Sequence, residues 1–209
     1  MNLKKSKIEN LERKYRLNLI NSITGIKPAN LIATKSEEGV ENVAVISSVV
    51  HLGSHPAQLA FVLRPQVEKE SDTFKNIKST ERYSINHIPE NLIKKAHYTS
   101  AKLGSEESEF DRMNIEKEYV EDFFAPFVKE SPIKIGMKLS SIIDLPNDCK
   151  FIIGNVEQLI LADDLVNNLG QIDLQKSKSA GISGLNSYYS LSKLDTFPYV
   201  RTSEIPEFE

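Results

Sequence analysis

The sequence contains a single cysteine, Cys149, in 209 residues. One thiol cannot form a disulfide within the chain, and no Cys-x-x-Cys redox motif is present. This scarcity excludes a small secreted domain that is held together by disulfides, and it favours a reducing compartment. We therefore expect a cytoplasmic protein that is stabilised by an ordinary hydrophobic core.

Long apolar runs are also missing, since no uninterrupted stretch approaches the ~18 residues that a membrane-spanning helix needs. The N-terminus, MNLKKSKIENLERKYR, begins with basic residues but does not continue into the apolar segment of a secretory signal. A net charge of -3 and a pI near 5.9 create no field that would attract nucleic acid or acidic lipid. We expect neither a membrane nor a nucleic-acid partner, and any bound anion must be held by a local pocket.

The common catalytic motifs are absent. The chain has no G-x-S-x-G elbow, no G-x-G-x-x-G fingerprint and no P-loop, and this argues against a serine hydrolase and a Rossmann nucleotide site. His51 and His55 are four residues apart, but Gly53 and Pro56 make a helix there improbable, and no cluster completes a metal site. Most carboxylates lie in charged runs that are typical of a solvated surface, including Glu37, Glu38, Glu106, Glu107, Glu109 and Asp111.

The remaining composition is that of an ordinary globular chain, with 40% apolar and 26% charged residues. Because no repeat or linker is visible, we expect one domain over residues 1–209. It has a helical N-terminal extension at about 6–24 and a C-terminal segment at about 180–209 that wraps the surface.

Periodicity predicts more strands than helices. Short aliphatic or β-branched runs predict strands at 29–34, 42–47, 58–64 and 83–88, and two longer ones at 133–145 and 150–163. Helices are expected from Ser71 and from Pro89, and a short one in the aromatic stretch EYVEDFFAPFV. These elements predict a mainly β barrel with peripheral helices. The phenylalanines of FFAPF (123–127) are explained equally by a dimer contact and by the chain's own core.

The stretch SSVVHLGSHP, between the second and third predicted strands, is unusually polar for a hairpin connection. Hydroxyl and backbone N–H groups at a strand end or a helix start can bind a phosphate when a cation is near. Ser47 and Ser48, the helix start at Ser71–Thr73, and Arg64 or Lys27 supply such groups. Turn formation by the serines and helix capping by Ser71 explain the same residues without a ligand.

The chain resembles the flavin reductase-like FMN-binding split-barrel family, which includes flavoredoxin-type proteins. The resemblance runs from about Lys27 to Phe110 and consists of several short pieces in order. These are KPANLIAT, NVAVISSV after a glycine turn, HPAQLAF, the helix SDTFKNI, the strand YSIN, AHYTSA and SEFD. One departure is Pro56-Ala57, where many relatives carry paired prolines. The resemblance implies a split β-barrel of Greek-key type.

The resemblance also implies a site, in which FMN lies across one end of the barrel near a homodimer interface. Ser47, Ser48 and Val49 would lie along the cofactor, and Thr73 would approach its phosphate. The other expected contributors are Asn42 and Asn86, which would support or touch the flavin, Arg64 and Lys27, which would balance the phosphate charge, and His97 and Ser100, which would reach its open side. His97 is explained equally well as a packed or surface helix residue. No catalytic acid or base is identified, and none is needed when the cofactor carries the chemistry.

Three functions remain open at this point. The first is an FMN-dependent oxidoreductase that takes hydride from NAD(P)H and reduces flavin, another small molecule or a partner protein. The second is an FMN-binding electron carrier or flavin-storing protein without NAD(P)H activity of its own. The third is a barrel that binds no cofactor, which would be favoured if Ser47, Ser48 and Thr73 were buried and bonded to one another.

Overall fold

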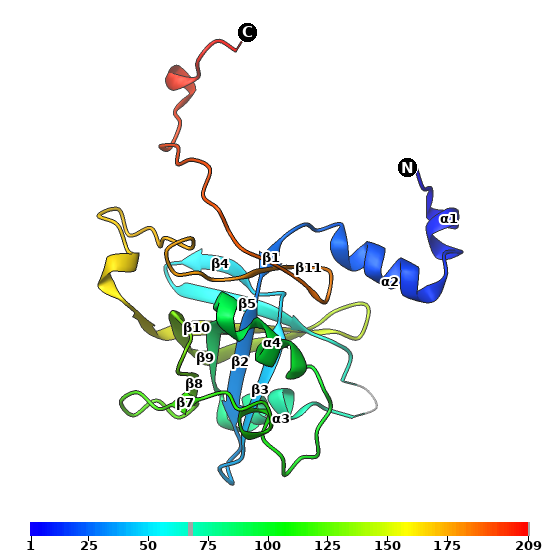
Figure 1. Cartoon of the computed structure of the whole chain (residues 1–209), viewed down its shortest axis with the longest axis vertical. Coiled ribbons are helices and arrows are strands. Elements are labelled where there is room, and N and C mark those ends of the chain that lie inside the picture. Colours follow the sequence, from blue (N-terminus) through cyan, green and yellow to red (C-terminus); the bar gives the residue numbers. More distant parts are fainter. Residues whose placement is uncertain (67–68, 209) are drawn as a thin grey trace.

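A seven-stranded antiparallel sheet forms the centre of the computed structural model, which describes residues 1–66 and 69–208 (Figure 1). The strand order is β3-β2-β6-β9-β10-β5-β4, and every pair of neighbours is antiparallel. The strands are β2 (Asn30–Lys35), β3 (Glu41–Ile46), β4 (Val50–Ser54), β5 (Ala57–Leu63), β6 (Arg82–His87), β9 (Ile133–Asp144) and β10 (Lys150–Leu161). The predicted mainly β fold is confirmed.

The sheet is curled, so its two ends approach each other. Residues 47–49 connect β3, at one end of the strand order, with β4, at the other. The Ser48 hydroxyl both donates to the Val62 carbonyl and accepts from the Val62 N–H, each at 3.0 Å. These two bonds link the end of β3 to β5 and hold the barrel together across its split.

Two apolar clusters lie on opposite faces of the curled sheet, because successive side chains of a strand alternate between faces. The inner cluster includes Phe61, Tyr83, Ile85, Met137 and Ile152. Helix α3 (Asp72–Thr80) closes one end of it by burying Phe74 and Ile77. The outer cluster packs the other face against α4 (Ile93–Tyr98) and α5 (Glu109–Arg112), which follow the short helix η1 (Glu90–Leu92).

Helix α3 begins where the sequence predicts. The Ser71 hydroxyl accepts a hydrogen bond from the Phe74 N–H at 3.3 Å, as an N-cap residue does. The helix ends at Glu81, whose φ of 56° is left-handed and therefore stops the helical turn.

The polar stretch after β3 is not the loop that we expected. Residues 50–54 form β4, which pairs with β5 as a hairpin, and the turn contains a cis peptide bond between His55 and Pro56. A register shift between His51 and Gly53 interrupts the alternation of side chains, so the strand pattern is not visible in the sequence. Within the polar stretch, residues 47–49 connect β3 with β4, and His55 and Pro56 form the turn between β4 and β5.

The aromatic stretch 118–128 is not a helix, because Pro126 cannot continue one. It forms a turn and then β8 (Phe127–Val128), which pairs with β7 (Lys117–Glu118). Ala125 and Phe127 are fully buried, whereas Phe124 is partly exposed beneath the Lys35 ammonium, 4.3 Å from its ring centre. Most of this stretch therefore packs within its own chain.

Both ends of the chain differ from expectation. The N-terminal segment forms two helices, α1 (Lys5–Glu9) and α2 (Arg13–Ser22), because the Glu12 carboxylate accepts from the N–H groups of Lys14 and Tyr15 and starts a second helix. Near the C-terminus, β11 (Gly181–Ser183) and β12 (Ser187–Tyr189) form a small sheet with β1 (Lys27–Pro28).

Residues 190–208 contact the rest of the described chain only at their start, where the Lys193 N–H donates to the Gln175 side chain at 2.9 Å and Leu191 and Thr196 line a cavity with the segment after β10. The remainder of this segment, with one short helix, η3 (Thr202–Glu204), near its end, stands away from the barrel (Figure 1). The remaining short helix, η2 (Asp163–Leu165), follows β10. Among the residues that the structure describes, no helix is long and apolar enough to span a membrane.

Candidate functional site

The outer edge of β3 is the starting point of the site, because β3 is the last strand in the order and has a neighbour on one side only. Two side chains cover this edge. The Val43 N–H donates to the Glu109 carboxylate at 3.3 Å, and the Val45 N–H donates to the Thr99 hydroxyl at 2.9 Å. The N–H groups of β3 that point away from the sheet form a row along this edge, beginning with those of Val43 and Val45. Glu109 begins α5 and Thr99 follows α4, so residues at the outer helices accept hydrogen bonds from the first two donors of this row.

The next donor of that row is left without a partner. Alternate N–H groups of an edge strand point the same way, so the Ser47 N–H follows those of Val43 and Val45. Within residues 1–66 and 69–208, the N–H groups of Ser47, Ser48 and Val49 and the Ser47 hydroxyl have no hydrogen-bond partner. The three residues are partly buried. Four donors without a partner among the described residues therefore lie within three consecutive residues at the split of the barrel.

The Ser48 side chain has a structural role. Because its hydroxyl is used by Val62, only the backbone of Ser48 remains available. The same contact brings the end of β5 beside the connection, and the exposed Arg64 follows two residues after Val62. Of the two predicted cations, Arg64 therefore follows a strand that contacts the connection 47–49.

The opposite end of β3 carries a buried polar cluster, defined as Thr34, Asn42, Thr73, Asn76 and Glu109. Asn42 Nδ2 donates to Glu109 at 2.5 Å, and the Thr73 hydroxyl donates to Asn42 Oδ1 at 2.8 Å. Asn76 Nδ2 donates to the Thr34 hydroxyl at 3.0 Å. Burial raises the pKa of the Glu109 carboxyl, while the bond from Asn42 opposes this rise.

Two expectations change as a result. Glu109 is only 7% exposed, so our interpretation of it as part of a solvated charged run is wrong. Thr73 and Asn42 were predicted to meet the cofactor, but their side chains bond to each other inside the chain. Ser47, Ser48 and Thr73 are not bonded to one another, so the condition that we set for a barrel without a cofactor is not met.

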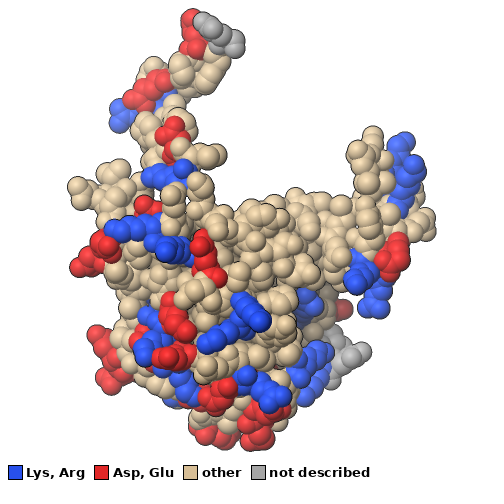
Figure 2. Space-filling model, viewed as in Figure 1, with Lys and Arg blue, Asp and Glu red and all other residues tan. Residues whose placement is uncertain are grey.

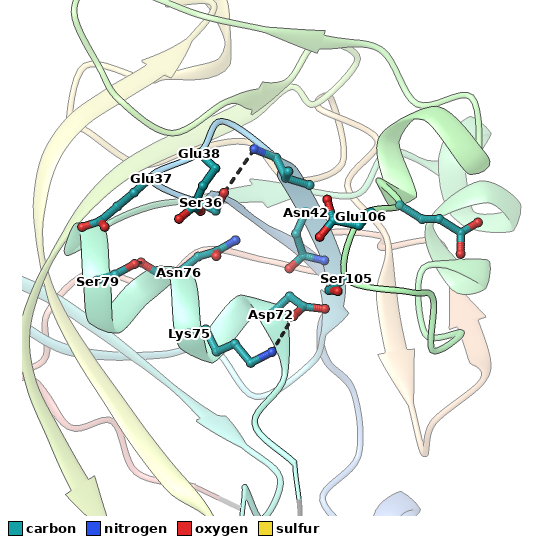
Figure 3. Close-up of a pocket in the computed structure, with 12 residues that line it drawn as sticks. Ser36, Glu37, Glu38, Asn42, Asp72, Lys75, Asn76, Ser79, Ser105 and Glu106 are labelled. Carbon is teal, nitrogen blue, oxygen red and sulfur yellow. Dashed lines mark hydrogen bonds and ion pairs between the residues drawn. The ribbon is translucent and has the colours of Figure 1, made fainter.

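A cavity of about 340 Å³ opens beside this cluster, between the β2–β3 turn, α3 and the loop before α5 (Figure 3). Carboxylates dominate its wall, namely Glu37, Glu38, Asp72, Glu106 and Glu107. Its one basic side chain, Lys75, is held by Asp72 at 3.1 Å. A phosphate would be repelled here, and the described residues include no group of three ligands that could hold a metal ion.

Asn86 is fully buried and its amide is used within the chain. It donates to the Leu31 carbonyl at 3.2 Å and to the Ser84 hydroxyl at 2.8 Å, and it accepts from the Val128 N–H at 3.0 Å. These bonds join β2, β6 and β8. Asn86 therefore supports the barrel and presents no atom to a ligand.

Lys27 belongs to the small sheet, and the α4 segment lies against it. Lys27 Nζ donates to the carbonyls of Asn21 and Gly184, at 3.3 and 3.2 Å, so its charge is already coordinated. His97 lies against Tyr188 of β12, with Nδ1 3.3 Å from the phenol oxygen. Ser100 is exposed and donates to the His97 carbonyl. The neighbouring Thr99 accepts from the Val45 N–H, so this segment lies along the edge of β3 and next to Ser47.

Asn30 was missed by sequence reasoning. It is 1% exposed, and neither atom of its amide has a partner among the described residues. It lies opposite Ile46 of β3 and His87 of β6, next to the connection 47–49. In the strand ANLIAT, Asn30 lies on the same face as Ile32, which belongs to the inner apolar cluster. A polar residue on this buried face was the sequence signal that could have identified Asn30.

Burial lowers the pKa of His87 to about 4, and its Nδ1 is 3.3 Å from the Ser179 hydroxyl.

The curled sheet and its open connection define the chain as a split barrel, and solved structures agree. A split-barrel protein of Shewanella frigidimarina, assigned as a flavin reductase, is 40% identical with a TM-score of 0.91, and the match covers 96% of this chain and all of that one. Nitrilotriacetate monooxygenase component B from Bacillus cereus gives 0.82 at 20% identity, covering 94% and 98% of the two chains. The flavoredoxin of Desulfovibrio vulgaris gives 0.72 at 20% identity, covering 84% and 92%.

The flavin reductase like domain family matches residues 26–174, and the chain belongs to that family. The predicted family is therefore confirmed. Membership supports a flavin-related oxidoreductase function and a flavin cofactor.

Proposed function

We propose that the chain is an FMN-binding oxidoreductase that takes hydride from NAD(P)H and passes reducing equivalents to flavin, another small molecule or a partner protein. The observation that carries this proposal is the set of unpartnered donors at residues 47–49, in a chain that belongs to a flavin reductase family. We propose a cytoplasmic location, in accordance with the single cysteine.

The residues present fit a flavin. The N–H groups of Ser47, Ser48 and Val49 suit the carbonyl oxygens and ring nitrogens of a flavin, all of which accept hydrogen bonds. The unpaired amide of Asn30, on the adjacent strand, supports a ligand at this end of the barrel. Arg64 would balance the phosphate charge, and the acidic cavity beside Asp72 makes the opposite end of β3 unsuitable for it.

Bound FMN would supply the hydride-accepting chemistry, so the chain needs no acid–base pair of its own. Its residues act by position. The connection 47–49 is held at one point by Ser48 and Val62, and a donor fixed on a rigid barrel orients a ligand with little reorganisation. The outer helices cover the Val43 and Val45 donors, so the ligand would meet the row at Ser47.

Absorption spectroscopy tests this function. Titration of the purified chain with FMN should shift the flavin bands with a stoichiometric end point, and anaerobic addition of NADH or NADPH should then bleach them. Bands that shift but do not bleach would contradict NAD(P)H use and favour the electron carrier. An unchanged spectrum, with no FMN uptake in equilibrium dialysis, would overturn the flavin site.

A matched pair of variants locates the site. Ser47→Ala removes one of the unpartnered donors, and we expect FMN to bind roughly 3- to 10-fold more weakly, as for a lost hydrogen bond of about 1 kcal/mol. Thr73→Val removes a hydroxyl that is used inside the buried polar cluster, and FMN affinity should stay within about twofold. A reversed order would place the ligand at the other end of β3.

A further inference from the structure

The acidic cavity beside α3 is not part of the proposed flavin site. Its wall is built by three segments that are distant in the sequence, namely the β2–β3 turn, α3 and the loop before α5. Five carboxylates and one ammonium give this wall a formal charge of -4. Figure 2 shows red side chains gathered at the lower end of the barrel, where the β2–β3 turn lies in Figure 1. Like charges so close together repel one another, and a bound cation would relieve that repulsion.

The chain itself neutralises little of this charge. Lys75 bonds to Asp72 at 3.1 Å and so balances one carboxylate. The four glutamates of the wall form no ion pair within the part of the chain that the structure describes. The remaining negative charge is felt inside the protein, because burial and, more weakly, the Asp72 charge raise the pKa of the Glu109 carboxyl.

A buried amide points into the same cavity. Asn76 is only 6% exposed, yet it lines the cavity, and Figure 3 shows its side chain projecting from α3 toward the middle of the opening. Its Nδ2 donates to the Thr34 hydroxyl, whereas its Oδ1 accepts no hydrogen bond from residues 1–66 or 69–208. Because buried acceptors are normally paired, this oxygen points to a ligand that carries a hydrogen-bond donor.

The lining residues do not suit two kinds of cation. The carboxylates do not converge on one point, since the described residues contain no group of three side chains that could hold a metal ion. None of the described residues that line the cavity is aromatic, so the cage that would bind a quaternary ammonium is missing. Cations with N–H donors remain, and the spread of the carboxylates favours several such donors on one ligand.

We propose that this cavity binds a linear polyamine, a flexible chain that carries two or more protonated amines. One ammonium group donates to Asn76 Oδ1, and the others lie against the carboxylates of the β2–β3 turn and of the loop before α5. The cavity of about 340 Å³ is within the usual size of a small-molecule site. This ligand and this site are separate from the flavin and from the connection 47–49.

Isothermal titration calorimetry of the full chain at low ionic strength tests the proposal, with spermidine, putrescine and butylamine as ligands. We expect one spermidine site per chain and an affinity that falls roughly 3- to 10-fold for each ammonium group removed, because each makes its own charge-assisted contact. Magnesium at matched ionic strength should not displace spermidine. Equal affinities for the three amines, or no binding of spermidine, would overturn the proposal.

A matched pair of double variants separates the cavity from the net charge of the chain. Glu38→Gln with Glu107→Gln removes one charge from each of two segments of the wall, and we expect spermidine to bind at least tenfold more weakly. Glu90→Gln with Glu130→Gln changes exposed residues that do not line the cavity and alters the net charge equally, so affinity should stay within about twofold. Equal losses in the two double variants would mean that spermidine responds to overall charge, which contradicts a site.

Amide chemical shifts of the chain labelled with 15N-serine locate the ligand without any flavin. Ser36, Ser79 and Ser105 line the cavity, one on each of its three segments. Spermidine should shift the N–H resonances of these three serines and leave those of Ser47 and Ser48 unchanged. Shifts at Ser47 and Ser48 alone, or at serines over the whole surface, would refute the site. Because FMN is absent, this result does not depend on whether the proposed flavin site is correct.

Discussion

The two ends of β3 are both rich in polar side chains, but they differ in how those groups are satisfied. At the start of the strand, Asn42 contacts Thr73 and Glu109 inside a closed cluster. At its end, the donors of Ser47 to Val49 have no partner among the described residues, and the amide of Asn30 beside them has none either. Polar composition alone would nominate both ends as binding sites. The missing partners favour the second one, because the buried amide of Asn30 is unpaired there and buried polar groups in a folded protein are normally paired.

The largest expected loss of stability comes from removing an acceptor from the buried polar cluster. Glu109→Ala leaves Asn42 Nδ2 and the Val43 N–H buried without an acceptor, so we expect a loss of about 3 kcal/mol in the free energy of unfolding. Chemical denaturation measures this loss. Glu106→Ala, in the exposed part of the same acidic run, should change stability by less than about 0.5 kcal/mol. Equal effects of the two substitutions would show that the cluster does not carry stability.

The second expected effect is a pH dependence of stability that comes from His87, which lies opposite Asn30 near the end of β3. Burial lowers the pKa of His87 to about 4 in the folded chain, whereas an unfolded histidine titrates near its usual 6.5. The unfolded chain then binds the extra proton first as the pH falls. Stability from neutral His87 is complete above pH 6.5 and is lost progressively toward pH 4, by up to about 2 kcal/mol after allowance for partial exposure.

The difference in unfolding free energy between wild type and His87→Asn, followed over this pH range, measures the contribution of the imidazole. A difference that does not vary with pH would mean that His87 is not held neutral by burial.

A smaller difference in unfolding free energy is expected between substitutions of Ser47 and Ser48. Ser48→Ala removes both bonds to Val62 and should lower the free energy of unfolding by about 1–2 kcal/mol. Ser47→Ala removes a hydroxyl without a partner in the chain and should change it by less than about 0.5 kcal/mol. Thermal and denaturant unfolding of the two variants, side by side, checks the order. If Ser47→Ala is the more destabilising substitution, its hydroxyl has a structural partner.

The smallest effect is expected at Thr73. Thr73→Val keeps the shape of the side chain and loses one bond to Asn42, at a cost of about 1 kcal/mol in stability. Denaturant unfolding of this variant measures the cost. Thr73→Ser, which keeps the hydroxyl, serves as the control and should retain the bond. An unchanged stability in Thr73→Val, together with a loss in Thr73→Ser, would mean that packing of the methyl group matters and the bond does not.

Much of the barrel could be predicted from the sequence. The long β-branched runs at 133–145 and 150–163 became β9 and β10, and the Ser71 cap began α3 as expected. β4 was missed because its irregular register around Gly53 hides the alternation. Pro126 was a signal against the helix that we expected at 118–128. These are local errors, and the mainly β fold was predicted in spite of them.

The site was less accessible to sequence reasoning. The sequence predicted a polar connection over residues 47–56, of which residues 47–49 connect β3 with β4 in the structure. The roles of Thr73 and Glu109 depend on partners that are distant in the chain. Glu109 meets Asn42 only after folding, across 67 positions, and no local pattern reports such a contact. Asn30 is similar, because an unpaired amide is a property of its surroundings. The exposure of apolar side chains near both ends of the chain could also be seen only in three dimensions.

Amide chemical shifts of the chain labelled with 15N-serine test the central claim most directly. The claim predicts that stoichiometric FMN shifts the N–H resonances of Ser47 and Ser48, while Ser84, buried under β8, stays unchanged. FMN that binds with full occupancy but moves neither Ser47 nor Ser48 would contradict the claim. The ligand would then lie elsewhere, and the unpartnered donors at the end of β3 would need a different explanation.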